Sequence, residues 1–310
     1  MFYIKKNSST KRLELKIFGI KIKLLKKCPS PEKNLLYELA DPRTLENIKL
    51  PKILDLDKSL DELIASGKSI ARYGDGEFKL LMGENIGFQK SHPELSRRLK
   101  EILKYENDNV IVGIIDIFGY CPSNYMKKVI MLCRETLYKY INFDKTYVNA
   151  SLVRRFKFPT EKQGIEHFNK IKSLWNNKDI IIVEGNGSRL GVGNDLFDGA
   201  NSIKRILCPI KNAYSKYDKI LSECLKESKD KLFILALVPT ATLLAVDLAE
   251  KGYRALDIGH LDTCYETFLR KSDKFVHVEG KVVFNSERYN CLIKPCKDED
   301  YNKQISTYIK

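Results

Sequence analysis

The sequence predicts an α/β fold with a Rossmann-like, mostly parallel sheet and helices on both of its faces. Apolar runs typical of buried strands recur along the chain, at residues 110–117, 180–183, 203–207, 232–238 and 276–283. Segments with a helical spacing of apolar residues separate these runs, and we expect helices at residues 59–66, 93–105, 126–141, 165–175, 217–226 and 241–250. Such alternation indicates a parallel sheet, because parallel neighbours need a crossover connection.

The length of 310 residues suits one large domain or two intimate ones. Residues 11–27 alternate apolar with charged side chains around Phe18-Gly19, which predicts a short basic hairpin, and residues 28–32 indicate a linker. We therefore expect a basic β-ribbon with a linker at 1–50, the main domain at 51–296 and a loose polar tail at 297–310. The ribbon either packs on the domain or contacts an anionic membrane. Its two-residue alternation favours packing, because it argues against an amphipathic membrane helix.

Charge and cysteine usage narrow the classes of function. The net charge of +14 favours polyanionic partners, but no RNA-binding or helix-turn-helix signature is present, so nucleic acid is not an expected partner. The eight cysteines include no C-x-x-C pair, which favours reduced thiols. No apolar run approaches the ~20 residues of a membrane span, and the first residues lack a signal-peptide core. We expect a cytoplasmic protein, with peripheral contact at the inner membrane face as an additional hypothesis.

The hexapeptide RYGDGE at residues 72–77 is the most informative motif. Asp75 and Glu77 lie one residue apart between Gly74 and Gly76. In an extended segment, side chains at i and i+2 point to the same side, so the two carboxylates could share a metal ion. Oxygen ligands favour Mg²⁺ or Mn²⁺, which in turn favour a diphosphate. The alternative is an ordinary Asp-Gly turn.

A glycine-rich turn follows the predicted strand at 180–183. Gly185, Gly187, Gly191 and Gly193 would let backbone N–H groups approach phosphate oxygens, and Arg189 offers a planar fork to a diphosphate. The spacing G-x-G-x-x-x-G-x-G is not the dinucleotide fingerprint, and the alternative is a tight structural connection.

Two later segments also follow predicted strands. Pro239 and Thr240 open a helix at a strand end, where open α/β sheets bind ligands, whereas Thr242 is expected only to cap that helix. Further along, Asp257 and His260 could act as a base or a metal ligand. Arg154 and Arg155 are either phosphate or sugar contacts or surface charges, and both interpretations stay open.

Taken in order, RYGDGE, SRLGVGNDLF, IKRILCPIKNAYSKYD and PTATLLAVDLAEKGYRALDIGHLD resemble the GT-D-type glycosyltransferase family of bacterial glycan and capsule clusters. The resemblance spans about residues 59–269. It implies a Rossmann-related enzyme that transfers a sugar, typically glucose from UDP-glucose, with a D-x-E motif that engages a divalent metal, Mn²⁺ or Mg²⁺.

Carried over to this sequence, the resemblance places Asp75 and Glu77 at the metal and the donor diphosphate, with Arg72 adjacent. It places three residues beside the nucleotide sugar: Arg189, Asn194 and Asp195. It assigns Thr240, Asp257 and His260 to the pocket. The family pattern has a glycine before Pro-Thr-Ala, whereas this chain has Val238, which puts the shape of that loop in question. Independently of the resemblance, a carboxylate such as Asp257 or Asp262 could deprotonate the acceptor hydroxyl, and the sequence leaves open which of them does so.

The expected function is therefore a metal-dependent hexosyl transfer from a UDP-sugar to a glycan acceptor on a protein or lipid carrier, in surface polysaccharide or glycoprotein biosynthesis. Two rivals use the same features. A metal-dependent nucleotide or phosphoester hydrolase would turn over the donor equally fast without an acceptor. A non-catalytic scaffold of a glycan assembly complex would be unaffected by loss of both Asp75 and Glu77.

Overall fold

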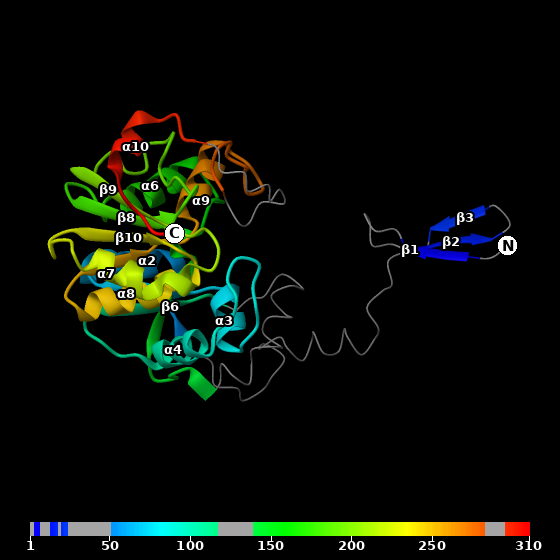
Figure 1. The fold of residues 1–310 in the computed structure, drawn as a ribbon, viewed down its shortest axis with the longest axis horizontal. Helices are drawn as coiled ribbons and strands as arrows, with labels where there is room; N and C mark the ends of the chain where they lie inside the picture. The colour runs from blue at the N-terminus through cyan, green and yellow to red at the C-terminus, as the bar shows by residue number, and fades with distance from the viewer. Residues whose placement is uncertain (1–2, 7–12, 18–19, 24–50, 117–138, 283–294) are drawn as a thin grey trace.

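A nine-stranded parallel sheet organises most of the chain. The computed structural model describes residues 3–6, 13–17, 20–23, 51–116, 139–282 and 295–310 (Figure 1). The strands of the large sheet are β4 (Lys52–Ile53), β5 (Ser69–Tyr73), β6 (Val110–Ile114), β7 (Thr146–Asn149), β8 (Asp179–Gly185), β9 (Ser202–Cys208), β10 (Leu232–Ala236), β11 (Arg254–Asp257) and β12 (Ile305–Tyr308). Their order is β12-β9-β8-β10-β11-β5-β6-β7-β4, and every described pair is parallel. The predicted α/β fold is confirmed.

Helices cover both faces of this sheet. They are α2 (Leu56–Ser66), α3 (Asp75–Leu81), α4 (Pro93–Lys104), η2 (Ala150–Val153), α6 (Glu161–Lys172), η3 (Ala213–Lys216), α7 (Tyr217–Cys224), α8 (Pro239–Glu250), α9 (Leu261–Leu269) and α10 (Glu299–Gln304). One apolar core joins the sheet to α3, α4, α7 and α8, and a second joins it to α2, α6 and α9. The helix predicted at 126–141 lies mostly outside the described residues.

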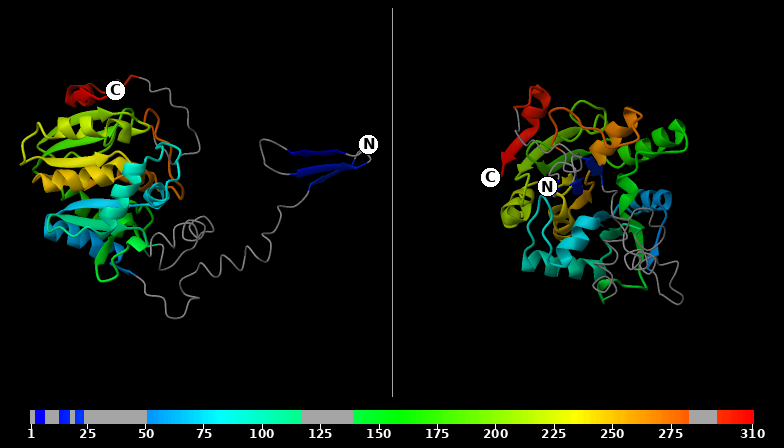
Figure 2. Two further views of the ribbon diagram at one scale, coloured as in Figure 1. Left: turned by 60° about the horizontal axis from the view of Figure 1, so that its bottom comes forward. Right: turned by 90° about the vertical axis from the view of Figure 1, so that its right-hand side faces the viewer.

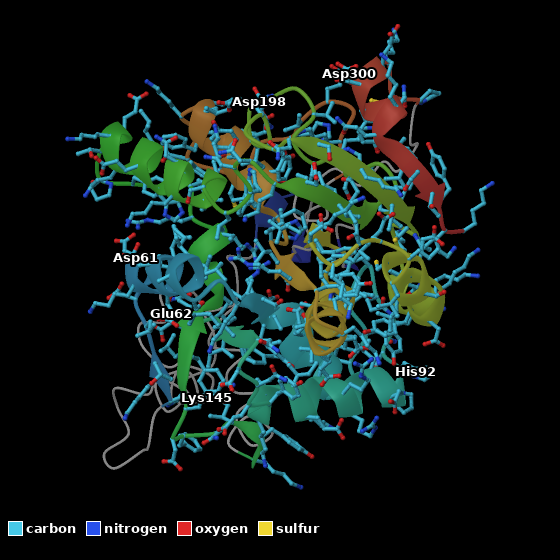
Figure 3. All side chains as sticks on the ribbon, turned by 90° about the vertical axis from the view of Figure 1, so that its left-hand side faces the viewer. Asp61, Glu62, His92, Lys145, Asp198 and Asp300 are labelled. Carbon is cyan, nitrogen blue, oxygen red and sulfur yellow. The ribbon has the colours of Figure 1, made fainter. Side chains whose placement is uncertain are left out.

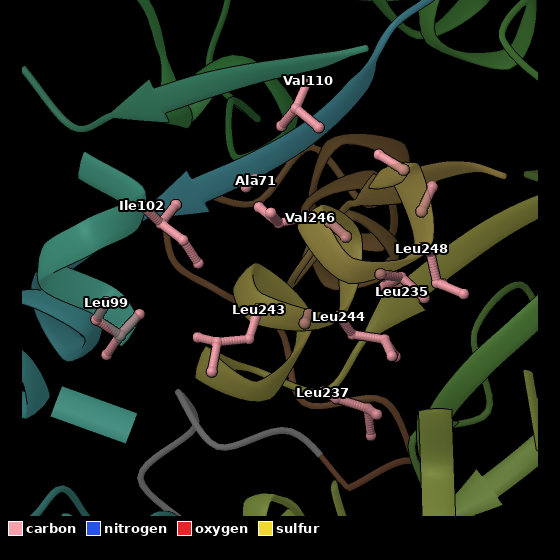
Figure 4. Packing of buried hydrophobic residues seen from close by; sticks show 14 of the residues in the cluster. Ala71, Leu99, Ile102, Val110, Leu235, Leu237, Leu243, Leu244, Val246 and Leu248 are labelled. Carbon is pink, nitrogen blue, oxygen red and sulfur yellow. The ribbon is translucent and has the colours of Figure 1, made fainter. Parts of the chain in front are cut away.

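Helix α8 is the most deeply buried helix of the first core. Its leucines at 243, 244 and 248 pack between β10 and α4, beside Leu235 and Leu99 (Figure 4). Burial on nearly all sides explains why α8 is apolar around its circumference. By contrast, Asp61 and Glu62 of α2 project from the surface (Figure 3). None of the helices described is long and apolar enough to cross a membrane.

The structure differs from the predictions at two places near the C-terminus. Residues 276–282 form a loop without strand pairing, in which Gly280 has a φ of +80° and Val282 N–H donates to Gly187 O. Residues 297–310 contain α10 and the edge strand β12, which lies beside β9 (Figure 2). An edge strand exposes one side to solvent, so its polar composition does not prevent pairing. This end is part of the sheet rather than a loose tail.

The basic N-terminal segment forms a second sheet. Strands β1 (Tyr3–Lys6), β2 (Leu13–Ile17) and β3 (Ile20–Lys23) are antiparallel in the order β1-β2-β3, and Ile17 lies opposite Ile20 at the hairpin. The predicted hairpin is therefore present and carries a third strand. The predicted linker at 28–32 lies outside the described residues.

Candidate active site

A cavity of about 460 Å³ opens at the carboxyl ends of the central strands. Parallel strands end at the same edge of a sheet, so loops distant in sequence meet there. Twelve residues singled out from the sequence line the cavity: Arg72, Gly74, Asp75, Gly76, Glu77, Arg154, Gly185, Val238, Pro239, Asp257, His260 and Asp262. Others do not, among them Gly187, Arg189, Gly191, Asn194, Asp195 and Thr240.

The acidic pair lies on a helix, not on an extended segment. Asp75 and Glu77 are the first and third residues of α3, where each residue turns by about 100° from the last, so the argument from extended geometry is wrong. Both side chains nevertheless line the cavity. Asp75 Oδ2 lies 3.9 Å from Lys79 Nζ, and Glu77 Oε2 accepts a 2.7 Å hydrogen bond from the N–H of Gly74.

Glu77 is held in an environment that disfavours its charge. Burial raises its pKa to about 7, and the nearby carboxylates of Asp257 and Asp75 add to the effect. Within the described ranges no group of three or more His, Cys, Asp or Glu side chains could hold a metal. Mg²⁺ and similar ions are, however, commonly held by one or two carboxylates together with substrate phosphates. The two carboxylates of Asp75 and Glu77 match the number that the protein provides in such a site.

Replacing Glu77 by Gln tests the charge directly. The folded pKa of about 7 exceeds the ordinary 4.5, so between these values the folded state binds more protons and its stability falls as pH rises. The side-chain amide of glutamine keeps an oxygen that can accept the hydrogen bond from the N–H of Gly74, but it carries no charge. We expect E77Q to exceed the wild type in unfolding free energy by about 3 kcal/mol at pH 8 without metal, and to match it at pH 4. Urea denaturation at both pH values measures this; parallel pH dependences would contradict it.

Arg72 and Asp257 form a fixed pair in the cavity wall. Arg72 donates from Nε to Asp257 O at 2.6 Å, from Nη2 to Asp257 Oδ1 at 3.1 Å and from Nη1 to Ala150 O at 2.7 Å. The N–H of Arg72 reaches Asp257 Oδ2 at 3.3 Å. Gly259 has a φ of +50°, and a Cβ there would lie 2.2 Å from Arg72 Nη2. Because both carboxylate oxygens orient Arg72, these contacts argue against Asp257 as the base.

His260 lies beside this pair and is partly exposed. Burial and the positive charges of Arg154 and Arg72 lower its pKa to about 3. The imidazole is therefore neutral at physiological pH. A neutral imidazole can accept a hydrogen bond from an acceptor hydroxyl, but it is a weak base.

Asp262 is fully occupied by structural contacts. Lys281 Nζ donates to its two oxygens at 2.9 and 2.8 Å, and the N–H of Gly191 and Nδ2 of Asn194 both donate to Oδ1 at 2.9 Å. This buried centre joins α9, the glycine-rich turn and the loop at 276–282. It argues for a positioning role of Asp262 rather than proton abstraction. The sequence did not predict that Lys281 pairs with Asp262, because the two residues lie in different segments of the chain and no local pattern links them.

The glycine-rich turn is anchored by a buried ion pair that sequence reasoning missed. Glu184 Oε2 accepts from the N–H of Leu190 at 2.8 Å, and Arg205 donates to Glu184 Oε1 at 2.7 Å and to Leu190 O at 2.9 Å. Gly187 and Gly191 adopt φ values of +95° and +72°, which explains the glycines by backbone geometry. Of this turn, Gly185, Ser188 and Leu190 line the cavity.

Three polar residues of the turn, Arg189, Asn194 and Asp195, do not line the cavity. Arg189 is buried and its Nη1 donates to Gly280 O at 2.7 Å. Asn194 Nδ2 also donates to Glu266 Oε1, and Asp195 pairs with Lys172 Nζ at 2.7 Å and with the hydroxyl of Tyr265. Their place beside the nucleotide sugar stays a prediction, and these contacts do not favour it. Thr240 is buried, and its Oγ1 has no partner among the described residues.

Val238 enters α8 with strained backbone angles. Its φ of +52° and ψ of −130° are rare for a β-branched residue and natural for glycine. Val238→Gly is expected to raise the free energy of unfolding by about 1 kcal/mol, because relief of strain exceeds the entropic cost of glycine. Val238→Ala, which retains a Cβ, serves as the control and should not stabilise. Chemical denaturation measures both; equal effects would contradict the strain argument.

Several cavity residues were not anticipated. The segment at 84–89 after α3 contributes Ile86 and Phe88, and the loop after β9 contributes Pro209 and Ile210. These loops are joined, because Asn212 N–H donates to Phe88 O at 2.8 Å. The cavity thus has an apolar part near the ends of β9 and β10 and a charged part around α3 and β11.

Comparison with known proteins gives consistent matches. A model of the "Glycosyltransferase GT-D fold" family matches residues 70–286. "Probable glycosyl transferase Gly" of Streptococcus gordonii is 40% identical over 268 residues, which cover 82% of this chain and 38% of that protein. "Glycosyltransferase GlyD" of Streptococcus pneumoniae serotype 4 is 33% identical over 289 residues, 89% of this chain and 35% of that protein. The chain thus spans under two fifths of the length of these curated relatives.

Solved structures show the same fold. One described as "A New Glycosyltransferase (DUF1792)" from Streptococcus sanguinis has a TM-score of 0.78 and 35% identity, covering 84% of this chain and all of that one. Another, of the domain of unknown function 1792 and described as having "a distinct glycosyltransferase fold", has a TM-score of 0.79 and 31% identity, covering 90% of this chain and all of that one.

Proposed function

Because the chain belongs to the family of glycosyltransferases with the GT-D fold, we propose that it transfers a hexose from a UDP-linked donor to a glycan acceptor. Glucose is the first candidate sugar, and the acceptor is carried on a protein or lipid. The main observation in support is that Asp75, Glu77, Arg72 and His260 all line one cavity at the carboxyl edge of the sheet.

The main electrostatic task of glycosyl transfer is to stabilise the departing nucleotide diphosphate. In the proposal, Asp75 and Glu77 would hold Mg²⁺ or Mn²⁺, and the ion would supply positive charge that offsets the negative charge of the leaving group. Asp257 keeps the guanidinium of Arg72 fixed toward the same part of the cavity. Ile86, Phe88 and Ile210 provide apolar surface suited to a nucleoside.

A donor screen tests the proposal. Thermal unfolding would be followed with UDP-glucose, other UDP-hexoses and GDP- or dTDP-sugars, each with and without Mn²⁺, because a ligand that binds only the folded state raises apparent stability. We expect a UDP-hexose to give the largest shift and to be consumed faster when a glycan acceptor is added. Consumption at the same rate without any acceptor would favour the hydrolase instead. Absence of turnover with every donor and acceptor pair would favour the scaffold.

A further inference from the structure

The cations that line the cavity differ in how they are engaged. Arg72 is held by Asp257 and Ala150, and Lys79 lies 3.9 Å from Asp75. Arg154 also lines the cavity, yet its guanidinium has no hydrogen bond or ion pair within the part of the chain that the structure describes. Its recorded contact is with the ring of Phe275, whose centroid lies 5.7 Å from Cζ.

Arg154 reaches the charged part of the cavity from a separate element. It ends η2, which follows β7, and so approaches from beyond β5 and β6. Its positive charge acts on His260 at the start of α9, together with that of Arg72. Two segments that are far apart in sequence, residues 72–77 and the end of η2, therefore bring Arg72, the acids of α3 and Arg154 around one space.

Arg154 is partly exposed, and a guanidinium that faces a cavity without a carboxylate partner among the described residues is available to an anion that enters the cavity. A guanidinium presents parallel N–H donors that match the oxygens of a phosphate, and such charge-assisted hydrogen bonds are stronger than neutral ones. Arg189, the arginine that the glycine-rich motif suggested for this task, is instead buried against Gly280 O. Asp75 and Glu77 supply the carboxylates of the cavity that could bind a metal ion. Arg154 supplies a positive charge that no side chain among the described residues neutralises.

We propose that Arg154 binds the diphosphate of the nucleotide-sugar donor through its guanidinium. The identity of the donor rests on the proposed function, whereas binding of a diphosphate anion does not. In this arrangement the guanidinium of Arg154 would supply positive charge beside the diphosphate, and a metal ion held by the acids of α3 would add to it, so both would offset the negative charge that develops on the leaving group.

The neighbouring Arg155 provides a matched control. Its Nη1 pairs with Asp57 Oδ1 at 3.1 Å, its guanidinium lies 4.5 Å from the centre of the Phe158 ring, and it does not line the cavity. Arg154→Gln and Arg155→Gln therefore remove the same charge from adjacent positions. Only Arg154→Gln should weaken anion binding in the cavity.

The experiment measures binding of inorganic pyrophosphate by calorimetry in a buffer with a fixed concentration of Mg²⁺. The wild type and R155Q should bind pyrophosphate alike, and R154Q should bind it about 10- to 100-fold more weakly. R154K, which keeps the charge but not the fork, should fall between them. The wild type should also lose affinity as salt rises, and R154Q should lose less. These readouts separate anion binding from a purely structural effect of Arg154.

Binding of UDP and of uridine then places the contact. R154Q should bind UDP more weakly than the wild type by a similar factor. It should bind uridine with unchanged affinity, because uridine lacks the phosphates. Equal pyrophosphate affinities for the wild type and R154Q, or no binding by either, would overturn the proposal even if sugar transfer is observed. Conversely, an R154Q-specific loss of pyrophosphate in a protein that transfers no sugar would retain the anion site and reject the proposed reaction.

Discussion

Replacing Asp75 by Asn is expected to lower kcat/KM for sugar transfer by about 10²- to 10³-fold. The amide preserves the size of the side chain and its place at the first position of α3, but removes the charge with which it would hold a divalent cation. Removal of one electrostatic contact to a transition state typically costs about 10²–10³-fold, and loss of a metal ligand acts on the same charge. Steady-state kinetics over a range of Mn²⁺ concentrations measures the effect. The Mn²⁺ concentration that gives half-maximal activity should be higher for the variant than for the wild type.

Asp195→Asn is the matched control for that prediction. Asp195 was also assigned to the nucleotide sugar by its motif, but the structure pairs it with Lys172 and Tyr265 outside the cavity. D195N should therefore transfer sugar within about twofold of the wild-type rate, in keeping with the small effects of most surface substitutions. If D195N lost activity and D75N retained it, the site would lie on the other side of the glycine-rich turn, and the cavity described above would not be the active site.

The sequence was informative where a local pattern determines structure. Apolar runs such as 180–183 and 232–238 predicted buried strands; the first falls within β8, and the second contains β10 and extends two residues beyond its end. Parallel strands share a carboxyl edge, and Gly74, Gly185 and Pro239, which lie at or just beyond the ends of β5, β8 and β10, line one cavity. The order of the strands could not be predicted in this way, because pairing of β8 with β10, or of β11 with β5, depends on contacts far apart in the chain.

Side-chain direction in irregular backbone was the main source of error. Arg189 has a φ of +51°, and this left-handed conformation turns its guanidinium toward Gly280 in a loop that no motif suggested. The same limit applies to Asp75 and Glu77, whose helical backbone changes the relation between positions i and i+2. The buried partners of the site, Lys281 and Arg205, were missed because lysine and arginine are usually exposed and a sequence does not show which are paired.

Replacing Arg205 by Met is expected to lower the free energy of unfolding by about 3–5 kcal/mol. Arg205 is 2% exposed and its partner Glu184 is fully buried, so removal of the guanidinium leaves a carboxylate in the core without its cation. The side chain also joins distant parts of the fold, because Nε donates to Gln304 Oε1 at 2.7 Å and the guanidinium lies 4.8 Å from the centre of the Tyr301 ring in α10. Urea denaturation measures the loss.

The double variant Arg205→Met with Glu184→Gln separates the cost of an unpaired charge from the value of the pair. Because a buried pair is often no more stabilising than neutral side chains of similar size, the double variant should recover a substantial part of the loss seen in R205M. Arg97→Met, which breaks an exposed pair with Glu94, should cost no more than about 1 kcal/mol. The same ion pair fixes both backbone groups of Leu190 in the cavity wall, so R205M should also raise the KM for the donor more than it lowers kcat. An R205M protein as stable as the wild type, with an unchanged KM, would show that the C-terminal strand and the glycine-rich turn are held by other contacts.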